Sequence, residues 1–83
     1  MFQLVFEKRA LEDLNKLDRQ IKERIWNKLQ NCKEEPFRFL EPLTEIKGFK
    51  LRIGDYRVII DVDFKENKLT VIKVGHRKNV YEK

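Results

Sequence analysis

The sequence predicts an α+β fold in which two N-terminal helices pack on one face of a small, mostly antiparallel sheet. Residues 2–6 alternate and are rich in aromatic and β-branched side chains, which is typical of a strand. Residues 7–35 change to a helical period, and residues 49–76 return to strand-like segments. The resulting order is β-α-α-β-β-β, and helices that precede a run of consecutive strands favour an α+β domain.

The helical region carries two apolar stripes and is expected to break between Leu17 and Asp18. The stripes are formed by two groups of residues: Ala10, Leu11, Leu14 and Leu17, then Ile21, Ile25, Trp26, Leu29 and Cys32. Asp18 lies between the stripes and is a suitable N-cap for the second helix. Cys32 is the only cysteine, so we expect it in the core and not in an internal disulfide.

An irregular stretch is expected between the helices and the strands. Two prolines bracket residues 36–47, and proline interrupts regular secondary structure. Phe37, Phe39 and Leu40 lie in this stretch, and we expect these apolar side chains to fold back onto the core.

The strand segments 49–53 and 56–64 are separated by Gly54-Asp55, a pair suited to a two-residue type II′ hairpin turn. This turn places Arg52 opposite Arg57. Strict alternation then divides the side chains between two faces of the hairpin. The face under the helices receives Phe49, Leu51, Val58 and Ile60, and the opposite face receives Lys50, Arg52 and Arg57.

The last strand, residues 68–76, is expected to add further cations to that opposite face. A three-residue turn at 65–67 pairs Ile60 with Ile72 and Arg57 with Gly75. Ile72 and Val74 then face the helices, and Lys73 faces the other way. Continuing the strand, five cations line one uncovered face of the sheet: Lys50, Arg52, Arg57, Lys73 and Arg77.

Two arginines directly across a strand pair repel each other, and a bound anion would relieve that repulsion. The net charge of +5 also suits a polyanion or an acidic protein partner, although a solvated surface gives the same composition. The alternative for Arg52 and Arg57 is that both reach into water or pair with Asp61 or a loop carboxylate.

The C-terminal stretch VGHRKNVY, residues 74–81, contains the only pair suited to proton transfer near a phosphate, His76 and Tyr81. Positive charge around a tyrosine favours the phenolate. The plainer readings are a solvent-facing His76 and a Tyr81 ring packed on the sheet edge. No acidic cluster offers a magnesium site, so we expect chemistry without a metal or another cofactor.

The hairpin KGFKLRIGDYRVII (47–60) and the closing VGHRKNVY (74–81) resemble the RelE/ParE superfamily of bacterial and archaeal toxin–antitoxin toxins. The resemblance covers essentially the whole chain, which we expect to form one domain, 1–83. It implies an mRNA interferase of the RelE type, which cuts mRNA in the ribosomal A site without a metal. The ribose 2′-hydroxyl attacks the adjacent phosphate, leaving a 2′,3′-cyclic phosphate and a 5′-hydroxyl.

The resemblance also implies roles for individual residues. Tyr81, or alternatively His76, takes the proton from the 2′-hydroxyl. Arg57 and Arg77 stabilise charge on the phosphate in the transition state. Arg77 or His76 supplies a proton to the leaving 5′-oxygen.

The substrate-binding residues implied by the resemblance are Lys50 and Arg52 for the RNA backbone and Lys73 for ribosomal RNA. The implied partners are the ribosome, mRNA and a cognate antitoxin that lays a helix over the toxin, giving a toxin–antitoxin hetero-oligomer. No apolar run is long enough to span a membrane, and no signal core is present, so a cytoplasmic protein is expected.

Two other functions remain open from the sequence. ParE-like toxins share the fold but poison DNA gyrase and lack the nuclease residues; here the basic set and the terminal tyrosine favour the nuclease. A catalytically inactive RNA-binding relative would be expected to expose aromatic side chains on the sheet for base stacking. The predicted open surface carries cations and Ile59 instead.

Overall fold

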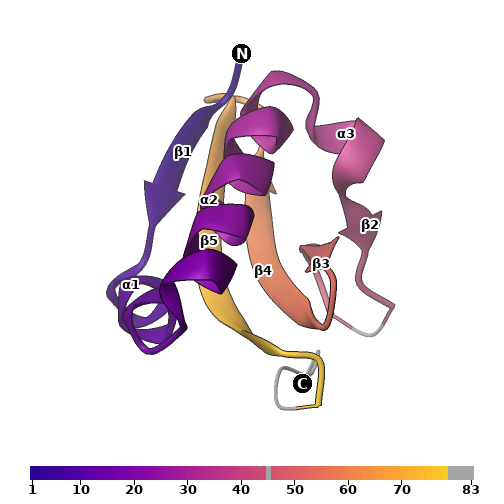
Figure 1. The fold of residues 1–83 in the computed structure, drawn as a ribbon. Helices are drawn as coiled ribbons and strands as arrows, with labels where there is room; N and C mark the ends of the chain where they lie inside the picture. The colour runs from indigo at the N-terminus through magenta and orange to yellow at the C-terminus, as the bar shows by residue number, and fades with distance from the viewer. Residues whose placement is uncertain (45, 79–83) are drawn as a thin grey trace.

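The computed structural model describes residues 1–44 and 46–78, and Figure 1 shows helices on one face of a five-stranded sheet. The elements are β1 (Gln3–Phe6), α1 (Lys8–Asn15), α2 (Arg19–Glu34), α3 (Pro36–Phe39), β2 (Glu41–Pro42), β3 (Phe49–Ile53), β4 (Tyr56–Asp63) and β5 (Lys68–His76). The strand order is β1-β5-β4-β3-β2; β1 runs parallel to β5, and the other pairs are antiparallel. The predicted α+β order is confirmed, with α3 and β2 as additions.

The predicted break between the two helices is also confirmed. α1 ends at Asn15 and α2 begins at Arg19, so Asp18 occupies the N-cap position of α2. Its side chain makes no capping hydrogen bond, so its contribution is limited to the extended backbone that starts the helix. In the described part of the chain, none of the helices is long and apolar enough to cross a membrane.

The core lies between the helices and the sheet, where α2 passes in front of β5 and β4 (Figure 1). Its fully buried side chains include Ile25 and Leu29 of α2, Leu51 of β3, and Ile60 of β4. Cys32 is fully buried among them, as predicted. Burial raises the pKa of its thiol to about 11, and the positive charge of nearby Lys28 opposes part of that rise. Cys32 is therefore a protonated core side chain near neutral pH.

Two residues of the predicted helical stripes lie at the edge of the core and not within it. Leu11 is 47% exposed and Trp26 is 48% exposed. The Trp26 ring stacks on Phe6 of β1 at a centroid distance of 5.8 Å, so it covers the side of the sheet at β1. The apolar stripes predicted from helical spacing are therefore wider than the strip of each helix that the sheet actually covers.

The segment between α2 and β3 is more regular than the sequence suggested. Pro36 occupies the first turn of α3, where its missing N–H and fixed φ are compatible with a helix start. Leu40 is buried and Phe39 packs against the core, as predicted. The prediction for Phe37 is wrong: its side chain is 56% exposed and stacks on Phe64 at 5.6 Å.

The β3–β4 hairpin has the predicted register throughout, including the direct pairing of Arg52 with Arg57. Gly54 has φ +58, a conformation that side chains with a Cβ rarely adopt. Asp55 is not in this region, and that combination is the one a type II′ turn requires. The turn therefore fixes which side chains of both strands face the helices.

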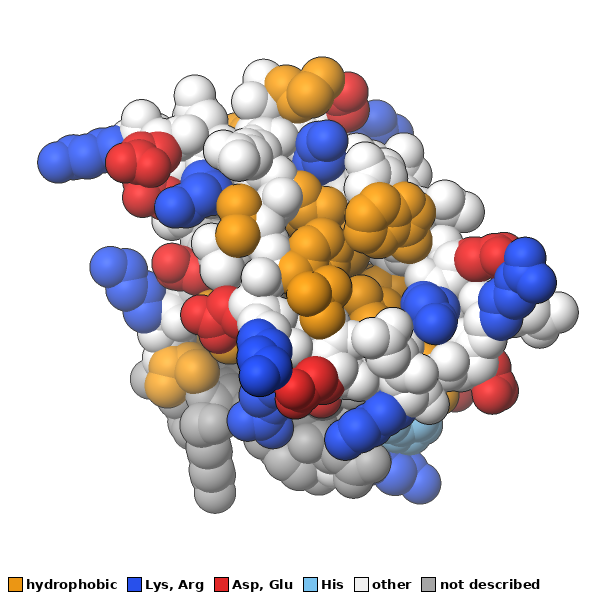
Figure 2. Space-filling view, turned by 90° about the vertical axis from the view of Figure 1, so that its left-hand side faces the viewer, with side chains coloured by type: hydrophobic (Ala, Val, Ile, Leu, Met, Phe, Trp, Pro, Cys, Tyr) orange, Lys and Arg blue, Asp and Glu red, His pale blue; other side chains and the backbone are white. Residues whose placement is uncertain are grey.

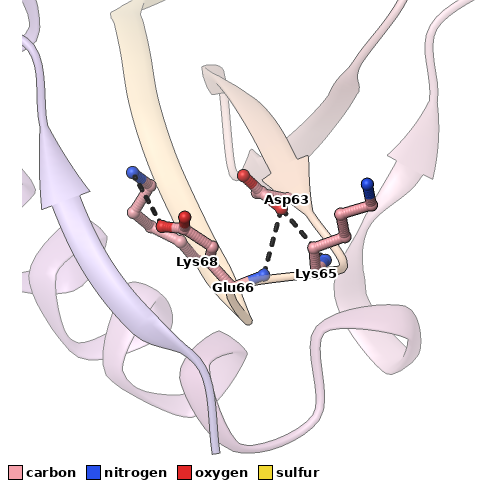
Figure 3. Close-up of polar contacts among 4 residues, drawn as sticks. All are labelled: Asp63, Lys65, Glu66 and Lys68. Carbon is pink, nitrogen blue, oxygen red and sulfur yellow. Dashed lines mark hydrogen bonds and ion pairs between the residues drawn. The ribbon is translucent and has the colours of Figure 1, made fainter.

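The turn between β4 and β5 differs from the prediction. Strand β4 ends at Asp63, not at residue 64, and Asp63 pairs with Lys68, so the turn contains four residues. One carboxylate oxygen of Asp63 accepts hydrogen bonds from the backbone N–H groups of Lys65 at 3.0 Å and Glu66 at 3.1 Å (Figure 3). Asp63 therefore stabilises the turn by accepting these two backbone hydrogen bonds.

A β-bulge reconciles this longer turn with the rest of the predicted register. Ile60 pairs with Val71, so the predicted pairing of Ile60 with Ile72 is wrong. A register shift at Ile59/Ile60 then restores the predicted pairing of Arg57 with Gly75. The expected placement of Ile72 towards the helices is also wrong, because Val71 occupies the core position there.

Candidate functional site

The face of the sheet opposite α1 and α2, which we call the open face, carries the predicted cations. In one row across the strands, Lys50 lies beside Ile59, and Ile59 lies beside Lys73. In the next row, Arg52 lies beside Arg57, and Arg57 beside Gly75. The rows are two residues apart, or about 7 Å along the strands. The pairing of β3, β4 and β5 thus brings together four of the five predicted cations: Lys50, Arg52, Arg57 and Lys73.

Arg52 has a carboxylate partner at the edge of the sheet. Its Nε lies 3.2 Å from Oε2 of Glu41, which pairs with Lys50 in the short strand β2. Both side chains are about half exposed, so the ion pair contributes at most about 1 kcal/mol to stability. The loop-carboxylate alternative considered from the sequence therefore applies to Arg52.

Arg57 is placed differently from Arg52. It is half-buried in the central strand of the cationic surface, and it forms no ion pair with the residues that the structure describes. Its neighbour on the other side is Gly75, which has no side chain to fill the adjacent space. Arg57 can therefore donate to an anion without first losing a carboxylate partner within this part of the chain.

Arg77 lies just beyond β5 and next to the hairpin turn. Its backbone N–H donates to the carbonyl oxygen of Asp55 at 2.8 Å. Its Nε lies 4.0 Å from a carboxylate oxygen of Asp55, and both side chains are largely exposed. The backbone bond fixes the position of residue 77, while the long ion pair leaves the guanidinium accessible to a ligand.

The end of β5 is held by α1 through a contact that sequence reasoning missed. The backbone N–H of Val74 donates to Oδ2 of Asp13 at 3.1 Å, in a partly buried position. This contact lies beyond the β1–β5 pairing, which stops at Phe6 and Val71. Asp13 therefore satisfies a backbone donor that β1 does not reach, next to Lys73 and Gly75.

His76 is not brought together with the cations of the open face. It pairs with Tyr56, whose ring packs against the core, and the two rings meet edge to face at 5.5 Å. Its Nδ1 accepts the backbone N–H of Lys78 at 3.2 Å. A neutral imidazole in this arrangement carries its proton on Nε2. The predicted candidate Tyr81 lies outside the described residues.

Carboxylates and cysteines do not form a metal site in the part of the chain that the structure covers: no group of three potential ligands is found there. Asp61 of β4 is exposed and shares the face of Arg57, but it lies four residues further along the strand, about 13 Å away. The positive charge of the open face comes from lysine and arginine side chains, and the carboxylates Glu41 and Glu7 lie beside it.

Hollows lie on the helix side of the molecule and on the open face of the sheet. An apolar groove of about 380 Å³ lies between α1 and α2 and is lined by Leu11, Leu14 and Trp26, among others. Figure 2 views the side of the molecule at β1 and shows hydrophobic side chains gathered at its centre, with charged side chains around them. A second hollow, of about 300 Å³, lies on the open face beside Ile59 and Lys73.

Sequence reasoning missed Glu41, Asp13 and this second hollow for different reasons. Glu41 belongs to a strand of two residues, which leaves no alternating pattern to detect. Asp13 contacts a residue that is 61 positions away in the sequence. The hollow depends on the β-bulge, which no local residue pattern indicated.

Comparisons with known proteins agree with this geometry. A family model described as the ParE toxin of the type II toxin–antitoxin system parDE matches residues 4–81. The RelBE2 toxin–antitoxin complex from Mycobacterium tuberculosis contains a similar chain, with a TM-score of 0.83 and 29% identity over 92% of this chain and 98% of that one. No curated protein sequence matches the chain.

The isolated RelE toxin of E. coli is similar as well, with a TM-score of 0.80 and 27% identity over 92% of this chain and 84% of that chain. The archaeal RelE–RelB complex from Pyrococcus horikoshii OT3 shares the fold, with a TM-score of 0.77 at 22% identity over 95% of this chain and 98% of that one. The match of the family model over nearly the whole sequence, together with these structures, shows that the chain belongs to the RelE/ParE superfamily of toxins of type II toxin–antitoxin systems.

Proposed function

We propose that this toxin is a ribosome-dependent endoribonuclease that cuts mRNA in the A site and thereby stops translation. The observation that supports the proposal best is the environment of Arg57. It lies on the open face between Arg52 and Gly75, with Lys50 and Lys73 in the adjacent row. Cations concentrated on an uncovered surface suit a phosphate chain that must be held and then attacked.

The proposed reaction exchanges one P–O bond for another and uses protein side chains and water while the ribosome presents the mRNA. The 2′-hydroxyl loses its proton to the phenolate of Tyr81, which becomes the neutral phenol, and the 2′-oxygen forms a bond to the adjacent phosphorus. The bond from phosphorus to the 5′-oxygen breaks, and this oxygen takes up a proton from Arg77 or through water. Arg57 and Arg77 stabilise the additional negative charge on the phosphate.

Tyr81 is a better candidate for the base than His76. The Nδ1 atom of His76 already accepts a hydrogen bond from the backbone of Lys78, and the ring packs on Tyr56. His76 lies beside Tyr56 on the helix side of the sheet, whereas Arg57 lies on the open face. In this proposal His76 orients the chain that follows β5, and Lys50, Arg52 and Lys73 hold the RNA.

A cognate antitoxin is part of the proposal. The similar chains from Mycobacterium tuberculosis and Pyrococcus horikoshii were solved as toxin–antitoxin complexes. A basic protein with a net charge of +5 and an uncovered cationic surface suits an acidic partner that competes with RNA. Co-expression with the adjacent gene should restore growth and prevent mRNA cutting.

The test is primer extension on a translated mRNA after the protein is induced in cells. The wild-type protein should produce cuts inside codons that disappear when the start codon of the reporter is removed. Arg57→Ala and Tyr81→Phe should abolish the cuts, and Lys65→Gln, at the far end of β4, should leave them unchanged. Uncut mRNA in cells that stop growing would contradict the proposal.

A ParE-like inhibitor of DNA gyrase is the second candidate, because the matching family model is described as a ParE toxin. The two functions differ in their dependence on Tyr81. For a gyrase inhibitor, Tyr81→Phe should remain toxic, and plasmid supercoiling should fall after induction. For the nuclease, supercoiling should be unaffected and the substitution should remove toxicity.

A further inference from the structure

The hollow on the open face lies close to the cations around Arg57 and has a mixed lining. Its apolar part is made by isoleucines from β4, β5 and the loop before β3: Ile59, Ile72 and Ile46. Ile59 is nearly buried and forms a small apolar cluster with Leu43, so the loop supports it from the side. We call this hollow, of about 300 Å³, the isoleucine pocket.

The β-bulge produces this pocket. Consecutive side chains of a regular strand point to opposite faces, yet Ile72 and Lys73 both line the pocket. Val71 and Val74, on either side of them, are both buried in the core. The extra residue at the register shift therefore gives the open face an apolar and a cationic side chain at adjacent positions.

The rim of the pocket is positively charged. Among the residues that the structure describes, Arg9, Lys47 and Lys73 line it together with Glu7. These three cations form no ion pair with other residues in the described ranges 1–44 and 46–78. An anionic ligand can therefore bind there without displacing a carboxylate of these described ranges from those cations.

We infer that the isoleucine pocket seats one nucleobase of the RNA chain whose phosphate lies against Arg57, an inference that rests on the proposed function. A nucleotide combines a flat apolar ring face with an anionic phosphate, which matches an isoleucine floor inside a cationic rim. Ile59 and Arg57 are two residues apart on the same face of β4, about 7 Å. That separation is close to the span of one extended nucleotide.

Glu7 gives the pocket a means of distinguishing bases. A carboxylate accepts two hydrogen bonds side by side from N1–H and the exocyclic amino group of guanine, whereas adenine, cytosine and uracil each offer it one donor group beside an acceptor. The isoleucines contact any ring face without preference. The pocket should therefore bias the base found at one position beside the cut, and Glu7→Gln should change that bias without removing cutting.

Methyl NMR of isoleucine-labelled protein provides a direct test. The probe is a 2′-O-methyl triribonucleotide, which cannot be cut, and its matched analogue lacks the central base but keeps both phosphates. The intact probe should produce ring-current shifts at Ile46, Ile59 and Ile72. These shifts should be absent with the abasic analogue, and the core methyl group of Ile25 should not move with either probe.

Two variants separate base contact from charge. Ile72→Ala should weaken the intact probe about five- to tenfold, because it removes apolar contact with the ring, and should leave the abasic analogue unchanged. Lys47→Gln should weaken both probes by the same factor. Leu11→Ala, which shortens an exposed side chain on α1, should affect neither probe.

Several results would overturn the inference. Equal shifts with the two probes, or equal weakening of both by Ile72→Ala, would mean that the pocket senses charge alone. Shifts caused only by an acidic, leucine-containing peptide would assign the pocket to a protein partner. The assay contains neither ribosome nor cleavage, so base binding by a protein that leaves cellular mRNA intact would refute the proposed function and not this inference.

Discussion

The two faces of the β3–β4 hairpin are built from alternate residues of the same two strands, yet their chemistry is opposite. On the helix side, Leu51, Val58 and Ile60 are fully buried. On the open face, Arg52 and Arg57 lie directly across from each other, and the like charges oppose the pairing. A shift of one residue would exchange the two faces, so the turn at Gly54 determines both the core and the cationic surface.

This comparison separates stability from function. The helix side should account for the free energy of unfolding, whereas the open face should contribute little to it and supply the binding of RNA. Substitutions on one face should therefore change one property and leave the other nearly unchanged.

The largest expected effect on stability comes from truncating a side chain of the covered face. Leu51→Ala removes a fully buried side chain from β3 and should lower the free energy of unfolding by about 3 kcal/mol. Urea denaturation followed by circular dichroism measures this change. A loss below about 1 kcal/mol would mean that the helices do not close tightly over this strand.

On the open face, Arg57→Gln should lower the rate of mRNA cutting by about 100-fold or more, because it removes a donor to the reacting phosphate. The free energy of unfolding should stay the same or rise by less than about 1 kcal/mol, since the repulsion with Arg52 is relieved. Lys65→Gln removes the same charge at the other end of the sheet and is the matched control. Equal loss of cutting in the two variants would assign the effect to net charge.

The turn that joins the faces can be tested separately. Gly54→Ala places a Cβ at φ +58 and about 3.1 Å from the Arg24 guanidinium, so it should destabilise the protein by about 1–2 kcal/mol. Gly54→Asn should cost less, because asparagine tolerates positive φ better than alanine does. Thermal unfolding of the two variants measures the difference. Identical melting temperatures of the two variants would mean that the destabilisation does not arise from the positive φ at residue 54.

The last expected effect is confined to alkaline pH. The pKa of Cys32 is raised by burial to about 11, above the ordinary value of 9.0, so folding favours the neutral thiol. Its contribution is complete below pH 9 and is lost as the pH rises towards 11, at about 1.4 kcal/mol per pH unit. Cys32→Ala has no thiol and should not show this loss of stability between pH 9 and 11. If the free energy of unfolding fell with pH in the same way in both proteins, the loss would not come from Cys32.

The hairpin and the helices could be predicted because short-range signals determine them. Gly54-Asp55 defines a two-residue turn, and that turn alone fixes every pair from Ile53–Tyr56 to Phe49–Ile60. The two apolar stripes and Asp18 likewise locate the break between α1 and α2. Three of the five cations, Lys50, Arg52 and Arg57, followed from this register without any tertiary information.

The second half of the sheet was less predictable because a bulge interrupts it. In Val71-Ile72-Lys73-Val74, two adjacent apolar residues compete for the core position, and the sequence does not say which is buried. The four-residue turn selects Val71, and the bulge then sends Ile72 to the open face. The prediction for Phe37 was wrong for a similar reason. Its ring stacks on Phe64, which is far away in the sequence, and no local pattern indicates that contact.

The most direct test of the central claim uses purified protein and ribosomes that hold an mRNA codon in an empty A site. Mass spectrometry of the products identifies their ends. The account predicts one cut within the codon, a 2′,3′-cyclic phosphate and a 5′-hydroxyl, with Arg57→Gln about 100-fold slower. Intact mRNA with the wild-type toxin, under conditions in which the same preparation inhibits gyrase, would contradict it.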